Sequence, residues 1–135
     1  MNRPEHLQPF HPDQTVVLLA EDEVMVQNIV RLTLEAAGYF VLTAHDGHEA
    51  LQLSRSYSGP IQLLLTDIMM PRMTGLELCQ HIRMERPQTK ILVMSGTHHP
   101  GTKYPYLSKP FSPDKLREAV RQVEPDGVLF RPSAV

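Results

Sequence analysis

Short apolar runs alternate with longer amphipathic stretches along most of this chain, and that alternation restricts the fold more than any other feature. Strand-like runs are TVVLLA (15–20), YFVLTA (39–44), IQLLLT (61–66) and KILVMS (90–95). The first lacks polar–apolar alternation, which is typical of a strand buried on both faces. A short fifth strand is predicted around Tyr106 and Leu107, and Pro105 is compatible with it only at a sheet edge.

Helical periodicity fills the intervals between these runs. Apolar residues recur at helical spacing within 26–37, 50–57, 78–82 and 116–123. Asp46 and Thr74 each stand three positions before a glutamate, the spacing of a capping box, and Ser112 can cap the last helix. Strands that alternate with amphipathic helices predict an α/β protein whose parallel sheet is covered by helices on both faces.

One interval breaks the pattern. Residues 96–108, GTHHPGTKYPYLS, contain two glycines and two prolines and show no apolar stripe. We therefore expect the helix between the fourth and fifth strands to be missing or reduced to a turn. The segment is long enough for a parallel crossover, which needs about 10 residues or more.

Length and composition favour a single domain in this chain of 135 residues. We place the domain at 15–124, with a flexible arm at 1–14 and a tail at 125–135. The net charge is −2 with no basic stripe, which argues against direct nucleic-acid binding. A single cysteine, Cys79, fits a reducing compartment. No signal-peptide core and no run of the roughly 20 apolar residues that span a membrane is found, so a cytoplasmic protein is expected.

Reactive side chains follow four of the predicted strands. Glu21 and Asp22 follow the first, Asp67 the third, Ser95 the fourth and Lys109 the fifth. The carboxyl ends of parallel strands share one edge of a sheet, where ligands of such folds bind. Neighbouring carboxylates need a compensating cation, and oxygen ligands suit Mg²⁺. With a lysine and a hydroxyl nearby, this set suits phosphoryl transfer, with Asp67 as the nucleophile.

Four motifs in this order, VVLLAEDE, LLLTDIMMP, MSG and YLSKPF, resemble the receiver domain of bacterial two-component response regulators over roughly residues 15–124. Each motif alone is weak, but the four together at strand ends are specific. The resemblance implies a doubly wound, flavodoxin-like, five-stranded parallel sheet of order 2-1-3-4-5. The chain departs from the family at the fourth helix: receivers normally have this helix, and here we predict that it is missing or very short.

The resemblance also implies roles for individual residues. Asp67 corresponds to the phosphoacceptor, Asp22 to the direct Mg²⁺ ligand and Glu21 to the acid that reaches the metal through water. Met69 would contribute its backbone carbonyl. The expected phosphodonor is a sensor histidine kinase or a histidine phosphotransfer protein, and the domain would be no enzyme beyond its own phosphorylation and dephosphorylation.

Three further residues correspond to the response machinery of the family. Ser95 resembles the hydroxyl that follows the phosphoryl group, and Lys109 the site lysine, joined to Pro110 by a cis peptide bond. Tyr106 occupies the place of the aromatic switch residue, although it can equally be an ordinary edge aromatic. Without the fourth helix, apolar side chains beside strands four and five should be uncovered, and we expect another chain to cover them, with a second copy in a homodimer as one candidate.

Other interpretations remain open at this stage. Asp67 could be a turn or helix cap, although Thr74 already caps the next helix. The chain could be an interaction module that keeps the fold but no longer signals by phosphorylation. A flavodoxin-like cofactor binder would need a phosphate loop where AEDE stands, and an aspartyl phosphatase a second acid just after Asp67. His98 and His99 lack the flanking ligands of a metal site, and Cys79 lies on an apolar stripe.

Overall fold

The computed structural model describes residues 14–97 and 100–123, so the predicted tail, nearly all of the predicted arm, and His98 and His99 lie outside the described residues. The elements in chain order are β1 (Val16–Ala20), α1 (Val24–Ala36), β2 (Phe40–Ala44), α2 (Gly47–Ser56), β3 (Leu63–Asp67), α3 (Gly75–Glu85), β4 (Lys90–Ser95), β5 (Tyr106–Ser108) and α4 (Pro113–Val123). The strands form one parallel sheet of order β2-β1-β3-β4-β5, which confirms the predicted fold class.

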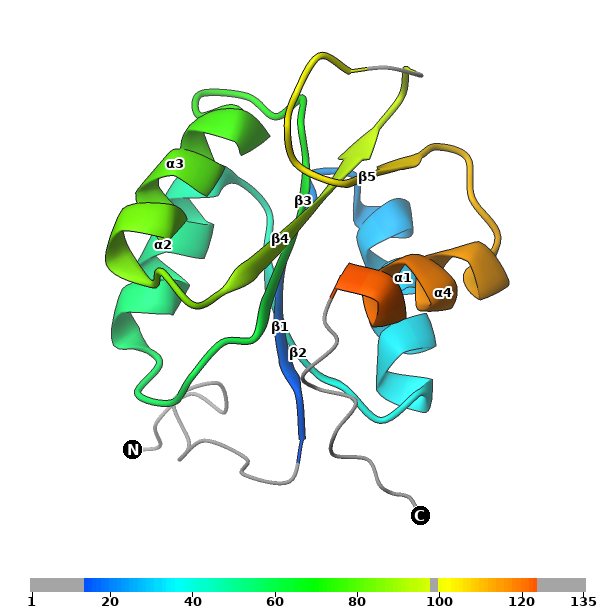
Figure 1. Ribbon diagram of the computed structural model, residues 1–135, viewed down its shortest axis with the longest axis horizontal. Helices are drawn as coiled ribbons and strands as arrows, with labels where there is room; N and C mark the ends of the chain where they lie inside the picture. The colour runs from blue at the N-terminus through cyan, green and yellow to red at the C-terminus, as the bar shows by residue number, and fades with distance from the viewer. Residues whose placement is uncertain (1–13, 98–99, 124–135) are drawn as a thin grey trace.

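Helices cover both faces of the sheet, α2 and α3 on one side and α1 and α4 on the other (Figure 1). Because side chains alternate along a strand, β1 supplies both cores: Leu18 packs towards α2 and α3, whereas Leu19 packs towards α1 and α4. All five residues of β1 and of β3 are buried. Burial of each leucine contributes about 1.5–3 kcal/mol, and this explains why the central strands are continuous apolar runs.

The capping signals of the sequence set the helix starts. Thr74 and Glu77 form a complete capping box at α3, and the Ser112 hydroxyl accepts the Lys115 N–H before α4. Asp46 accepts the Glu49 N–H as predicted, but the Glu49 carboxylate accepts the N–H of His45 rather than closing a box on Asp46. The bonds donated by the N–H groups of Glu49, Glu77 and Lys115 satisfy donors that the first helical turn leaves without an intrahelical partner.

The chain passes from β4 to β5 without a helix in the described residues of that connection, 96–97 and 100–105. The predicted loss of the fourth receiver helix is therefore confirmed, and α4 follows β5 directly in the sequence. In Figure 1 this connection is the yellow loop beside the upper end of β4. β5 is the edge strand, as Pro105 required, and the Pro105 carbonyl accepts the Val93 N–H at 3.0 Å.

The expected exposure beside strands four and five is wrong for β4. Its apolar residues on the α2–α3 side, Ile91 and Val93, are 7% and 0% exposed. The reason is local: Tyr104, in the connection itself, packs against the core on the α2–α3 side and takes part of the place of a helix. Tyr106 is exposed, and the predicted homodimer stays a prediction.

Helix α1 differs from its predicted stripe. Val30 and Leu34 are buried as expected, but Ile29 is 53% exposed and lies with Val24 and Met25 on the outer surface of the helix. Among the residues that the structure describes, no helix has both the length and the apolar character that a membrane crossing requires.

Candidate functional site

The sheet register brings the chemically active residues to one edge. Ala20 ends β1 beside Thr66, Asp67 ends β3 beside Met94, and Ser95 ends β4 beside Ser108. The residues that follow these ends therefore face a common space at the carboxyl edge of the sheet. The sequence predicted this placement, because the carboxyl ends of parallel strands share one edge of the sheet.

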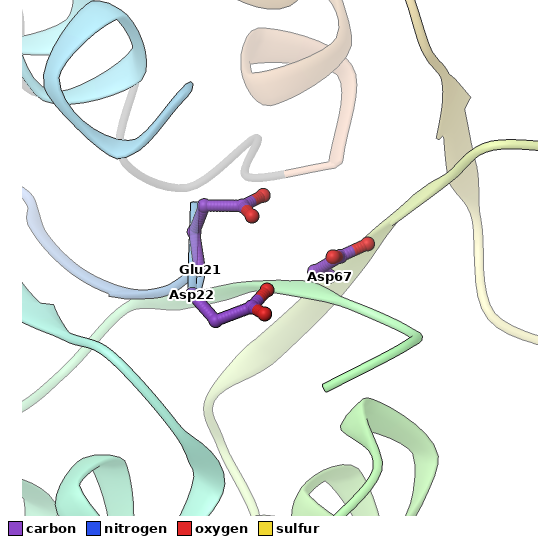
Figure 2. Close-up of side chains that lie close together, drawn as sticks. All are labelled: Glu21, Asp22 and Asp67. Carbon is purple, nitrogen blue, oxygen red and sulfur yellow. The ribbon is translucent and has the colours of Figure 1, made fainter. Parts of the chain in front are cut away.

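Three carboxylates converge at this edge, from Glu21, Asp22 and Asp67 (Figure 2). One oxygen of each lies within 4.8 Å of the others. Glu21 is fully buried and Asp67 is 7% exposed, whereas Asp22 is exposed. Two of the three acids are thus removed from water, and like charges repel more strongly in such a buried position than they do in water.

Lys109 supplies positive charge to this cluster from the end of β5. Its Nζ lies 3.0 Å from Glu21 Oε1, 3.4 Å from Asp67 Oδ2 and 4.0 Å from Glu23 Oε1. A cis peptide bond joins Lys109 to Pro110, as the resemblance implies, and the Lys109 N–H donates to the Ser95 carbonyl at 2.7 Å. The lysine bridges the acids of two strands that are neighbours in the sheet.

Burial raises the pKa of the Asp67 carboxyl above its usual value, Lys109 opposes this, and the negative charge of Asp22 adds to it. Burial also raises the pKa of Glu21, against the N–H of Glu23, which donates to its carboxylate. For Lys109 burial would lower the pKa, but the hydrogen bond to Glu21 and the charges of Glu21 and Asp67 outweigh it and raise the pKa. One ammonium therefore faces three carboxylates, and negative charge is left over.

That excess, in an all-oxygen donor set, fits a hard divalent cation such as Mg²⁺. Asp22 and Asp67 offer carboxylate oxygens, and the exposure of Asp22 leaves room for the waters that Mg²⁺ usually retains. A soft or borderline metal would be expected to recruit thiolate or imidazole ligands, and the cluster contains neither.

The β3–α3 junction holds Asp67 in place through Gly75. The Gly75 N–H donates to the Ile68 carbonyl at 2.8 Å, and a Cβ at position 75 would lie 1.9 Å from the Asp67 carbonyl oxygen. Any larger residue would therefore push the α3 start away from the end of β3. The Thr66 hydroxyl also donates to the Asp67 carbonyl at 2.9 Å.

Ser95 is buried at the same sheet edge, and its hydroxyl contacts Thr97. Its Oγ lies 2.9 Å from the Thr97 carbonyl oxygen, 3.1 Å from the Thr97 hydroxyl and 3.0 Å from the Thr97 N–H. The switch role of Ser95 thus stays a prediction, one that requires the hydroxyl to exchange Thr97 for another partner.

Tyr106 and Met69 are the remaining two residues with a predicted role. Tyr106 begins β5 opposite Val93 and is 38% exposed. Met69 lies two residues after Asp67 with an exposed side chain, and its expected contribution is a backbone carbonyl. Both roles stay predictions.

Sequence reasoning did not find the supporting residues Gln27, Thr66, Gly75 and Thr97. A glycine directly after a helix cap was the available signal for Gly75. A glutamine on the buried side of α1 was the signal for Gln27. The partners of both are backbone atoms of distant segments, which the sequence pattern does not specify.

Comparison with known proteins agrees with this geometry. The family model described as "Response regulator receiver domain" matches residues 17–121. The alkaline phosphatase synthesis transcriptional regulatory protein PhoP of Bacillus subtilis is 28% identical over 126 residues, which are 87% of this chain and 52% of that protein. The chain spans about half the length of such curated relatives.

Solved structures share the fold. The chemotaxis protein CheY4 of Vibrio cholerae matches with a TM-score of 0.76 and 32% identity over 82% of this chain and 98% of that one. The response regulator TrrA of Thermotoga maritima, in complex with Mg²⁺-BeF, matches with a TM-score of 0.72 and 29% identity over 82% and 99%. With the family model spanning nearly all the described residues, and the acids and the lysine at the expected strand ends, the chain belongs to the response regulator receiver domains of two-component systems.

Proposed function

We propose that this domain is the phosphoacceptor of a two-component phosphorelay, which takes a phosphoryl group from a phosphohistidine onto Asp67 with Mg²⁺ and signals through protein contacts. The observation that carries the proposal is the placement of Lys109 Nζ, 3.4 Å from Asp67 Oδ2, within a cluster of three carboxylates. A nucleophilic oxygen, a cation for the incoming phosphoryl charge and a metal site are thus available together.

In the proposed reaction, an Asp67 carboxylate oxygen attacks the phosphorus atom of the phosphohistidine. The P–O bond forms as the P–N bond breaks, and the imidazole leaves and takes up a proton. Lys109 moves towards the phosphoryl oxygens and stabilises their charge. Asp22 and Asp67 would hold Mg²⁺ directly and Glu21 would reach it through water, and the bound ion would supply positive charge for the phosphoryl group. The Met69 carbonyl completes the proposed ligand set.

Hydrolysis of the acyl phosphate by water, at the same pocket, would return Asp67 to its carboxylate form. Ser95 would exchange its Thr97 contacts for the phosphoryl group, and Tyr106 would respond at the β5 edge. Since the domain modifies only itself in this scheme, we do not class it as an enzyme.

The phosphodonor is proposed to bind over α1 and the segment between β5 and α4. Val24, Met25 and Ile29 are all more than half exposed on α1, and a patch of exposed apolar side chains is a candidate surface for binding a partner. Beside them lies a cavity of about 420 Å³ lined by Val26, Ile29, Val30, Lys109, Pro110 and Phe111. Because Lys109 belongs to both the cavity and the acidic site, a partner bound there would be close to Asp67. A histidine kinase or phosphotransfer protein with an apolar surface fits this position.

Intact-mass measurement after incubation with acetyl phosphate tests the proposal. With Mg²⁺ the wild-type protein should gain the mass of one phosphoryl group, and with EDTA it should gain none. The Asp67→Asn variant should stay unmodified under both conditions. A wild-type protein that remains unmodified with Mg²⁺ would favour the other candidate, an interaction module that keeps the fold without phosphorylation.

A further inference from the structure

Gln27 is a buried polar residue that neither the family resemblance nor the proposed chemistry uses. It lies in the second turn of α1 and is 5% exposed. Its Nε2 donates to two backbone carbonyls, Ala44 at 2.9 Å and Glu21 at 3.2 Å. An amide buried so completely is expected to be tied to specific partners, since an unsatisfied buried polar group is costly.

The two accepting carbonyls lie where the neighbouring strands β1 and β2 end: Glu21 directly follows β1, and Ala44 is the last residue of β2. Ala44 pairs with Ala20 in the sheet register, and the Glu21 N–H donates to the Ala44 carbonyl at 3.1 Å. That carbonyl therefore accepts from both Glu21 and Gln27. One side chain of α1 thus joins the helix to the ends of β1 and β2, the two strands between which α1 lies in the sequence.

The segment held in this way carries two of the three acids. Glu21 and Asp22 follow Ala20 directly, and their carboxylate oxygens lie within 4.8 Å of an oxygen of Asp67. Mutual repulsion among these charges favours separation of the strand ends. A backbone fixed on both sides, by β2 and by α1, resists that separation before any cation arrives.

We propose that Gln27 is a positioning residue for the metal site: it fixes the backbone of Glu21 so that the carboxylates of Glu21 and Asp22 stay aimed at Asp67. The inference extends the proposed function, because it concerns how the proposed Mg²⁺ site is organised. Loss of a group that orients metal ligands commonly costs roughly 10–100-fold in metal affinity.

The test is the Gln27→Met variant, which keeps a similar shape but has no N–H donor. Thr89→Val is the matched control, because the Thr89 hydroxyl is also buried and donates to a backbone carbonyl, that of Ile61 at 2.6 Å, before the start of β4 and away from the acids. Calorimetric titration with MgCl₂ at fixed ionic strength should show about 10-fold weaker binding for Gln27→Met. Thr89→Val should bind within twofold of the wild type.

A second measurement needs no metal. In EDTA, hydrogen exchange at the amides of Glu21 and Glu23 should be faster in Gln27→Met than in the wild type, and unchanged in Thr89→Val. If Gln27→Met does not fold, Gln27→Asn replaces it, because its amide is one methylene too short to reach both carbonyls.

The outcomes separate the two claims. Wild-type affinity and wild-type exchange in Gln27→Met, with only a loss of stability like that of Thr89→Val, would overturn the positioning role. If the wild-type protein itself does not bind Mg²⁺, the metal dependence of the proposed function fails. The positioning role is then decided by exchange alone, where faster exchange supports it and unchanged exchange overturns it.

Discussion

At the scale of single residues, the site is organised by an imbalance of charge. Glu21 and Asp67 are almost completely buried with one ammonium, that of Lys109, within 3.0 Å and 3.4 Å of their oxygens. Burial raises the pKa of both acids, so their ionised forms are held at some cost in stability. Binding of a divalent cation would remove that cost, which is a physical reason for such a cluster to bind metal.

Asp46 is a carboxylate whose pKa is lowered in the fold, in contrast to the raised pKa values of Glu21 and Asp67. Its Oδ1 accepts the Glu49 N–H at 2.8 Å and its Oδ2 pairs with Arg72 at 2.7 Å. The hydrogen bond from the Glu49 backbone, followed by that from Arg72, lowers the pKa of Asp46. A lowered pKa in the folded state means that Asp46 stabilises the fold above its unfolded-state pKa, and that this contribution is lost as pH falls through the folded-state pKa.

We therefore expect Asp46→Ala to lower the free energy of unfolding at pH 7 by about 1 kcal/mol, the usual value of a helix N-cap. The difference from the wild type should shrink as pH falls below the ordinary aspartate pKa of about 3.9. Urea unfolding between pH 3 and pH 7 measures this. Asp46→Asn, which keeps a capping oxygen but loses the charge, should be intermediate; a pH-independent deficit in Asp46→Ala would contradict the assignment.

At the scale of elements, α1 has two apolar surfaces with different tasks. One packs on the sheet through Val30 and Leu34, which are fully buried. The other, with Met25 and Ile29, is exposed next to the cavity that includes Lys109. A helix that serves only the core would bury its large apolar residues, so the exposed surface is consistent with a partner that binds there.

This division makes Ile29→Glu a selective variant. Phosphoryl uptake from a panel of autophosphorylated histidine kinases should fall at least 10-fold, because a charge would enter an apolar contact, whereas uptake from acetyl phosphate should stay within twofold. Met84→Glu is the control: Met84 is equally apolar and 83% exposed, but it lies on α3, on the opposite side of the sheet. Equal losses in the two variants, or a loss with acetyl phosphate, would contradict the assigned surface.

The sequence predicted the elements well where the signal is local. All five strands and the four helices lie at the predicted places, and the capping box of Thr74 forms as expected. The absent helix between β4 and β5 was predictable because glycine and proline disrupt a helix locally. The packing of Tyr104 against the core was not predictable, because Tyr104 contacts residues that are distant in sequence. The exposure of Ile29 was not predictable either, because Ile29 belongs to a regular apolar stripe.

At the scale of the whole molecule, the doubly wound topology converts separate motifs into one site. Glu21, Asp67 and Lys109 belong to the ends of three strands, and the order β2-β1-β3-β4-β5 places these strand ends so that Lys109 reaches both acids. The sequence could predict which residues share this edge, since parallel strands end together. It could not predict the distances, or that Gln27 and Gly75 support the strand ends, because those contacts depend on packing between distant segments.

The β4–β5 connection has no helix in its described residues, yet three carboxylates and Lys109 still meet at the sheet edge. We therefore propose that the phosphoryl chemistry and the signalling surface are separable in this domain. We expect partners of this domain to recognise a surface without the usual fourth helix.

The central claim is that the carboxylate of Asp67 forms a covalent bond to phosphorus. The most direct measurement is to treat the protein with acetyl phosphate and Mg²⁺, reduce the acyl phosphate with borohydride and sequence the peptides by mass spectrometry. Reduction converts a phosphorylated aspartate to homoserine, so homoserine is expected at position 67 and at no other aspartate. Homoserine at Asp22 or elsewhere, with position 67 unchanged, would contradict it.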